Sequence, residues 1–328
     1  MASTTKKEKR ERADYDIVIA GGGPAGLTAA KELAGRGKCV LLLEKTVIGE
    51  RPRSWIAWHE DIVKLGFGAA VINTIGTLVF RSFLGAEYNF NKCSSAIIDP
   101  VKLIGIMRRQ AVKAGARIRE KEGIIRYREE AGAVIAETGR GLYRAKYMID
   151  ASGAESVIQT GLSGSLPDKA YMGCYAVELS NLRIENASKA LIFDAAFPGK
   201  NYFWMLPYSK TKALAGCFIF EKLNEKTMSR ARKALMSYMK AEGIKGRREK
   251  TIIGNIPLGE RLHLRYGRVF ICGDAASSPL PSSGYGLLRA IREARLLAGC
   301  VASGFSKGEV KYEKAMISER FPGYELHY

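Results

Sequence analysis

The segment GGGPAG, residues 21–26, and the acidic residue Glu44 have the types and spacing needed to bind a dinucleotide. In the GxGxxG spacing, the first glycine permits a tight turn and the second lets backbone amides approach a pyrophosphate, while the third lets a helix pack closely on a strand. An acidic side chain at Glu44 would accept hydrogen bonds from ribose hydroxyls, and it disfavours a ribose with a 2′-phosphate. The predicted contacts are Gly21, Gly23, Pro24, Ala25, Gly26, Glu44 and Lys45.

A strand, a helix and a second strand must surround this turn if it is to hold a phosphate. Residues 15–20 (YDIVIA) and 38–43 (KCVLLL) are apolar runs typical of buried parallel strands. Between them, Leu27, Ala30 and Leu33 fall at helical spacing. The sequence therefore predicts a βαβ unit with the glycine turn at its first connection.

The run from Asp16 to Glu44 resembles the amino-terminal signature of glutathione-reductase-type and hydroxylase-type flavoproteins, which commonly have a proline and an alanine between the glycines. A later run, RVFICGDAASSPLPSSGYGLLRAI (residues 268–291), resembles their second flavin motif. The resemblance implies FAD as the cofactor and a ribityl contact at Asp274. It also implies a helix amino terminus near residues 282–286, whose amide dipoles would stabilise a reduced isoalloxazine. The implied contacts are Gly273, Asp274, Ser283, Gly284, Gly286 and Leu287.

The segment IDASG, residues 149–153, resembles the turn that these flavoproteins place between the two motifs. No second GxGxxG unit follows a strand, so the sequence predicts no separate nicotinamide domain. Electrons would come from transiently bound NAD(P)H or from a protein donor, and both alternatives stay open.

Residues 201–217 (NYFWMLPYSKTKALAGC) resemble the YxWxFP-then-VG stretch of geranylgeranyl reductases, and related lycopene cyclases have a comparable stretch. Residues 251–259 (TIIGNIPLG) resemble the segment that these families place shortly before the GDAA motif. The resemblance implies an isoprenoid substrate whose double bonds take hydride from the flavin. Such a substrate requires a long apolar wall, because its alkenes have no polar handle. Alternate side chains of one strand, Tyr202, Trp204 and Leu206, are the predicted substrate contacts.

The chain departs from the reductase pattern at several positions. Pro100 stands where geranylgeranyl reductases usually have an arginine, and Arg51 or Arg53 would serve the pyrophosphate instead. The loop VIGERPRSW lacks the cysteine pair of some archaeal relatives. The sequence identifies no catalytic residue. The candidate proton donors are Tyr202, Tyr208 and Tyr285, and His59 is assigned a structural role.

The order of these segments predicts an α/β protein with a Rossmann-like FAD-binding domain that is discontinuous in sequence. A smaller substrate domain with an antiparallel sheet is predicted between its parts, because short alternating runs occupy residues 76–98 and 172–254. The predicted ranges are 1–13 for a basic tail, 14–66, 99–167 and 260–304 for the FAD-binding domain, 67–98 and 168–259 for the substrate domain, and 305–328 for a short carboxy-terminal segment.

The chain is strongly basic, with 52 lysines and arginines against 33 acidic residues and a formal charge of +19. No nucleic-acid-binding motif accompanies this charge, so nucleic acid is not an expected partner, whereas peripheral contact with an anionic membrane is. The six cysteines form no CxxC pair, and the amino terminus is charged. These features predict a cytoplasmic protein with reduced cysteines, peripheral at most to a membrane, and no metal site.

The favoured function is therefore FAD-dependent reduction of double bonds in a geranylgeranyl-type lipid. A flavin monooxygenase of the aromatic-hydroxylase type has the same flavin motifs and would consume oxygen with NAD(P)H. A lycopene-cyclase-like flavoprotein would instead leave the mass of its carotenoid unchanged. The non-enzymatic alternative is a protein that binds flavin and a lipid without chemistry.

Overall fold

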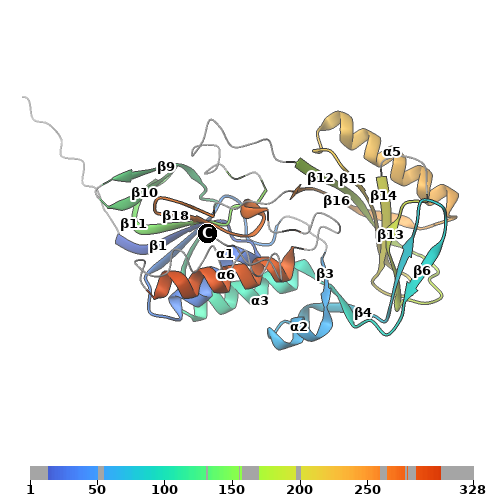
Figure 1. Cartoon of the computed structure of the whole chain (residues 1–328), viewed down its shortest axis with the longest axis horizontal. Helices are drawn as coiled ribbons and strands as arrows, with labels where there is room; N and C mark the ends of the chain where they lie inside the picture. The colour runs from blue at the N-terminus through green and yellow to red at the C-terminus, as the bar shows by residue number, and fades with distance from the viewer. Residues whose placement is uncertain are drawn as a thin grey trace, which may run out of the picture.

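The computed structural model describes residues 14–50, 55–130, 132–154, 156, 170–196, 201–258, 264–277, 279 and 286–303. Within these ranges the chain forms an eight-stranded sheet at one end of the molecule and a seven-stranded sheet at the other (Figure 1). A small three-stranded sheet lies between them.

The eight-stranded sheet has the order β17-β18-β11-β1-β2-β8, and β18, β11, β1, β2 and β8 run parallel. Strands β9 and β10 extend from β11 as an antiparallel meander. The strands are β1 (Asp14–Ala20), β2 (Val40–Glu44), β8 (Arg117–Glu120), β9 (Ile124–Glu130), β10 (Ala133–Thr138), β11 (Gly141–Asp150), β17 (Arg265–Tyr266) and β18 (Val269–Ile271).

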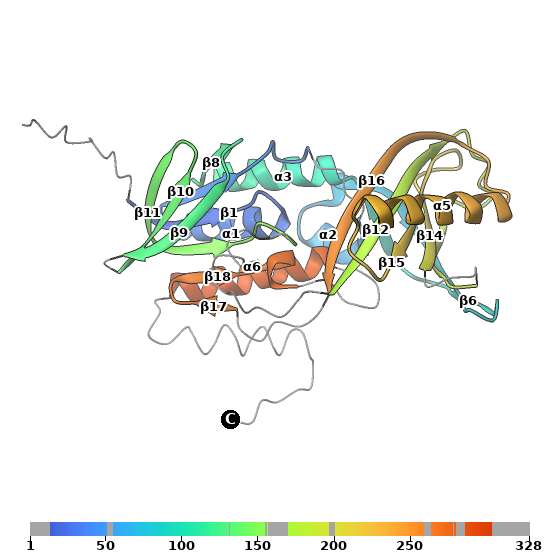
Figure 2. The ribbon, with the colours of Figure 1, turned by 90° about the horizontal axis from the view of Figure 1, so that it is seen from above.

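Both faces of this parallel sheet are covered. The helices α1 (Pro24–Ala34), α3 (Pro100–Lys113) and α6 (Leu287–Ala302) cover one face, with α1 between the other two (Figure 2). Ile17 and Ile19 of β1 pack toward these helices, whereas Val18 packs toward the meander on the other face. Burial on both faces explains why the strand is a continuous apolar run.

The seven-stranded sheet has the order β16-β12-β15-β14-β13-β5-β6. One face packs against helix α5 (Glu225–Ala241), where the rings of Phe203 and Tyr238 stack with centroids 4.1 Å apart. Its strands are β5 (Thr77–Arg81), β6 (Glu87–Phe90), β12 (Ala170–Ser180), β13 (Lys189–Asp194), β14 (Asn201–Pro207), β15 (Ala213–Ile219) and β16 (Arg247–Leu258).

The third sheet joins β3 (Trp55–Trp58), β7 (Ser95–Ile98) and β4 (Val71–Ile75) in that order. The short helices α2 (His59–Lys64) and η1 (Gly68–Ala70) lie in the same part of the chain, and η2 (Gly273–Ala276) follows β18. The predicted domain ranges separate β3 from its partner strands. The boundaries between the two domains stay a prediction.

The predicted fold class is confirmed, because a discontinuous parallel sheet covered by helices accompanies a second, mainly antiparallel sheet. The smaller sheet differs from the prediction in one pairing, since β5 and β13 run parallel. Parallel neighbours need a long crossover, and the intervening residues 82–188 provide one.

Gly26 should be essential for folding, because a Cβ there would lie 2.0 Å from the carbonyl oxygen of Gly21. We predict that Gly26→Ala destabilises the protein by about 1–3 kcal/mol, the usual cost of overpacking. Urea unfolding without added cofactor measures this. The control is Gly299→Ala in α6, where an added Cβ meets no atom within 4 Å and should stabilise slightly. Equal unfolding midpoints for the two variants would contradict the prediction.

Candidate functional site

A pocket lies between the carboxyl ends of the parallel strands and the seven-stranded sheet, with a cavity volume of about 330 Å³. This volume falls in the range of small-molecule sites. One wall comes from the glycine turn after β1, the turn after β11 and the turn after β18. The opposite wall comes from the face of the seven-stranded sheet that does not contact α5.

The glycine turn after β1 is pressed against the turn after β11. Gly21 has φ +103°, and a Cβ there would lie 2.3 Å from the carbonyl oxygen of Ala151. Gly23 lines the pocket, and a Cβ there would meet no atom within 4 Å. Gly26 lies behind the turn, against Gly21. The three glycines therefore divide their roles between close packing and open space for a ligand.

Glu44 ends β2 at the wall of the pocket with its carboxylate fixed in position. Gly22 N donates to Glu44 Oε2 at 2.8 Å. The backbone and the hydroxyl of Thr46 both donate to Glu44 Oε1 at 2.9 Å. Because three donors hold it, the carboxylate is preorganised to accept hydrogen bonds from a ligand.

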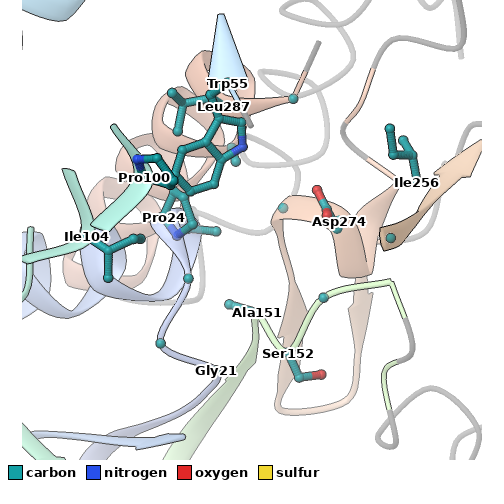
Figure 3. Close-up of a pocket in the computed structure, with 18 of the residues that line it drawn as sticks. Gly21, Pro24, Trp55, Pro100, Ile104, Ala151, Ser152, Ile256, Asp274 and Leu287 are labelled. Atoms are coloured by element: carbon teal, nitrogen blue, oxygen red, sulfur yellow. The ribbon is translucent and has the colours of Figure 1, made fainter. Parts of the chain in front are cut away.

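The second glycine-bearing turn reaches the same pocket from the far end of the chain. Gly273 has φ +66°, and a Cβ there would lie 2.8 Å from Cβ of Ala25 in α1. Cys272 N donates to the carbonyl of Asp150 at 3.0 Å, which joins this turn to β11. Figure 3 shows Asp274 at the pocket, across from Pro24. Three distant turns therefore meet at one cavity.

Two buried carboxylates hold these turns, and the sequence analysis did not identify them. Asp150 accepts hydrogen bonds from Ser152 N at 3.0 Å and from the hydroxyls of Ser152 and Ser156. Glu293, which is fully buried in α6, accepts from Gly273 N at 3.3 Å. An acidic residue inside an amphipathic helix is usually solvated, so no pattern in the sequence indicates the buried role of Glu293.

The structure adds a cluster of pocket residues that the sequence did not assign. Trp55, Pro100 and Ile104 line the pocket, and Figure 3 shows Trp55 close to Pro24, Pro100 and Leu287. Because residue 100 is a proline and not an arginine, the lining of the pocket is apolar at this point. Arg51 and Arg53 lie outside the described residues.

The strand β14 divides its side chains between the two faces of its sheet. Trp204 and Leu206 line the pocket, and the indole of Trp204 lies on Gly216, where a Cβ would be 2.3 Å from the ring. Tyr202 points to the same side, but it is 3% exposed and does not line the pocket. Its hydroxyl donates to Met172 Sδ at 3.4 Å. The Trp204 indole N–H is buried and has no hydrogen-bond partner among the described residues.

The two candidate proton donors within the described residues are not at the cavity. Burial raises the pKa of Tyr202 and of Tyr208, and neither residue lines the pocket. Tyr285 lies outside the described residues. Cys174 of β12 is the ionisable side chain on the sheet wall of the pocket, as far as this wall is described.

The predicted contacts divide into three groups. Those that line the pocket are Gly21, Gly23, Pro24, Ala25, Glu44, Lys45, Trp204, Leu206, Gly273, Asp274, Gly286 and Leu287. Gly26 and Tyr202 pack behind its walls. Arg53, Ser283 and Gly284 lie outside the described residues. The individual roles of all these residues stay predictions.

Other features of the described residues bear on the class of protein. The six cysteines are free thiols. The described part of the chain has no cluster of three or more side chains that could hold a metal ion. It also contains no helix of the length and apolarity needed to span a bilayer.

The parallel sheet, the glycine turns and the pocket at the strand ends define a dinucleotide-binding fold of the kind that flavin-dependent oxidoreductases use. The chain belongs to the family described as lycopene cyclase protein, whose model matches residues 16–320. The expected resemblance to geranylgeranyl reductases and lycopene cyclases is thereby confirmed.

Relatives by sequence include two archaeal reductases. A digeranylgeranylglycerophospholipid reductase of Methanocella arvoryzae is 24% identical, with 91% of this chain and 80% of that protein covered. A second enzyme so named, from Methanosphaera stadtmanae, is 27% identical, with 93% and 84% covered.

Solved structures include proteins of the same fold. A geranylgeranyl bacteriochlorophyll reductase-like protein from Thermoplasma acidophilum superposes with a TM-score of 0.83 at 20% identity, covering 94% of this chain and 84% of that one. A flavin-dependent brominase superposes with a TM-score of 0.76 at 16% identity, covering 94% and 85%. One fold therefore carries several flavin chemistries.

Gly23→Val should weaken FAD binding without unfolding the protein, because the side chain enters the open space at the pocket. We expect FAD affinity to fall at least about tenfold, the equivalent of roughly 1.4 kcal/mol. Isothermal titration of the flavin-free protein with FAD measures the loss. The control is Gly139→Val, which also meets no atom within 4 Å but lies outside the pocket lining. Retained FAD affinity in the Gly23 variant would refute the assigned site.

Proposed function

We propose that this chain binds FAD and uses it to reduce double bonds of a geranylgeranyl-type isoprenoid lipid. The observation that carries the proposal is one pocket with two kinds of wall. Glycine turns and a fixed carboxylate form the first wall, and an apolar sheet face forms the second. A cofactor held at the first wall would meet an apolar substrate held at the second.

The residues present fit FAD. The open space at Gly23, the amino end of α1 and the carboxylate of Glu44 together suit a dinucleotide. Asp274, Gly286 and the start of α6 would contact the flavin end. When bound and reduced, FAD supplies the hydride for the alkene. Its electrons would come from a nicotinamide nucleotide or from an electron-transfer protein.

The sheet wall fits an isoprenoid chain. Ile192, Leu206, Phe218 and Ile252 line it, and they offer contact area without polar groups. The buried indole N–H of Trp204 is the exception, and an unpaired buried donor is costly. The names of the archaeal relatives support a lipid of the geranylgeranyl class.

We predict that the reduced flavoprotein converts a geranylgeranyl glycerolipid in the absence of oxygen. Chemical reduction of the flavin removes the need to know the natural donor. Mass spectrometry should find a gain of two hydrogens for each double bond reduced, and the flavin should reoxidise in step. A product of unchanged mass would indicate a cyclase instead. Gain of an oxygen atom under air would indicate a monooxygenase. The absence of any product would favour a protein that binds flavin and lipid without chemistry.

Trp204→Ala should impair the reaction, since it removes a large part of the apolar sheet wall of the pocket. We expect kcat/KM for the lipid to fall at least about tenfold, or roughly 1.4 kcal/mol of transition-state stabilisation. The control is Met205→Leu, because Met205 packs on the α5 side of the same strand. Equal effects of the two substitutions would show that the sheet face is not the substrate wall.

A further inference from the structure

We propose that the hairpin of β5 and β6 is a membrane-docking element that inserts Phe83 and Leu84 into the interface of an anionic lipid bilayer. The proposal goes beyond the chemistry of the pocket and does not depend on which reaction occurs there. It rests on the exposure of the hairpin tip, the direction of its aromatic rings and the charges around it.

The tip of the hairpin presents two apolar side chains on a well-formed turn. Phe83 is 76% exposed and Leu84 is 83% exposed. Ser82 N donates to the carbonyl of Ala86 and Gly85 N to the carbonyl of Ser82, both at 2.9 Å. The turn is therefore hydrogen-bonded within itself, and it holds both side chains outward. Two large adjacent apolar residues at a fixed tip are typical of interaction sites.

The aromatic side chains of β6 extend the apolar surface from the tip toward the pocket. Tyr88 is 57% exposed, and Phe90 is 55% exposed. Phe90 pairs with Leu78 across the strands, and Leu78 packs against the cluster that contains Trp204. The exposed rings thus lie on the pocket side of the sheet. A bilayer at this edge would lie along the sheet face that lines the pocket.

The hairpin also lies apart from the parallel sheet. Figures 1 and 2 both show β6 at the opposite end of the molecule from β9 and β10. It is the last strand of its sheet. A bilayer can therefore reach it without meeting the flavin-binding half.

The charges around the hairpin favour an anionic surface. The acidic groups here are already paired, because Arg81 contacts Asp194 at 2.8 Å and Glu242 at 3.1 Å, and Lys189 contacts Glu87 at 3.1 Å. The lysines nearby are exposed and have no acidic partner within the described ranges. They are Lys92 after β6, Lys240 in the last turn of α5 and Lys245 after that helix. An apolar tip, together with unpaired lysines at the base of the hairpin and at the end of α5, is the composition of an interfacial anchor.

The shape of the tip distinguishes a bilayer from a protein partner. Two side chains on a narrow turn form a convex wedge, whereas protein interfaces of standard size need a broad complementary surface. Pairing with a second copy through β6 would offer only a four-residue edge strand, Glu87–Phe90. The bilayer is the occupant that fits a short convex wedge on a part of the molecule that also carries unpaired lysines.

Flotation of the FAD-loaded full-length chain with lipid vesicles tests the proposal. We expect binding to phosphatidylcholine vesicles that contain phosphatidylglycerol, and at least tenfold weaker binding to phosphatidylcholine alone or in high salt. Phe83→Ser with Leu84→Ser should lower the partition coefficient at least tenfold. The matched control is Val112→Ser with Ile125→Ser, which removes two apolar side chains of 52% and 54% exposure elsewhere. Thermal unfolding should be alike in both double variants.

Several outcomes would overturn the proposal. They are wild-type protein that stays with the soluble fraction, a tip variant that floats like wild type, and a control that loses binding as strongly as the tip variant. A tip variant that turns a dimer into a monomer in solution would assign the hairpin to a second copy instead. Turnover of detergent-dispersed lipid is measured separately. If the wild-type protein does not reduce the dispersed lipid, the proposed reaction is refuted, whereas the result on membrane docking is unaffected.

Discussion

The close approach of backbone segments at glycine positions is the constraint on which the pocket depends. A Cβ at Gly21 would clash with Ala151, and a Cβ at Gly273 would press on Ala25. These contacts bring the turns after β1, β11 and β18 to one cavity. Larger residues would push the turns apart, and Glu44 and Asp274 would then no longer line the same site. The glycine-turn wall of the pocket is thus a property of backbone packing more than of side-chain chemistry.

The second wall depends on the alternation of side chains along β14. Phe203 stacks on Tyr238 of α5, so its neighbours Trp204 and Tyr202 must turn to the opposite face. The stacked pair therefore determines which side chains of β14 face the pocket. Asp194 adds to this arrangement, because it accepts hydrogen bonds from Tyr238 and Arg81 at 2.8 Å. The core under α5 and the apolar lining of the pocket belong to one packed unit.

Local patterns predicted the parts of the site that chain neighbours determine. The spacing of Gly21, Gly23 and Gly26 and the acidic end of β2 predicted a glycine turn and a carboxylate that the structure places at one pocket. The same reasoning could not find Trp55 or Glu293, because their positions depend on strands and helices packed far away in sequence. It placed Tyr202 beside Trp204 correctly by strand period. The alternation of side chains along a strand determines only which face of the sheet a residue lies on. Whether that residue reaches the cavity depends on how deeply neighbouring side chains bury it.

The order of strands in the parallel sheet has a consequence for synthesis of the chain. Strand β1 leaves the ribosome first, but its neighbour β11 follows more than a hundred residues later, and β18 comes later still. Such non-local pairing delays folding, because long loops must close before the contacts stabilise them. Nascent chains that stop before residue 269 therefore lack β18 and the last of the three turns that line the pocket. The pocket is consequently complete only after β18 and the turn that follows it have been synthesised.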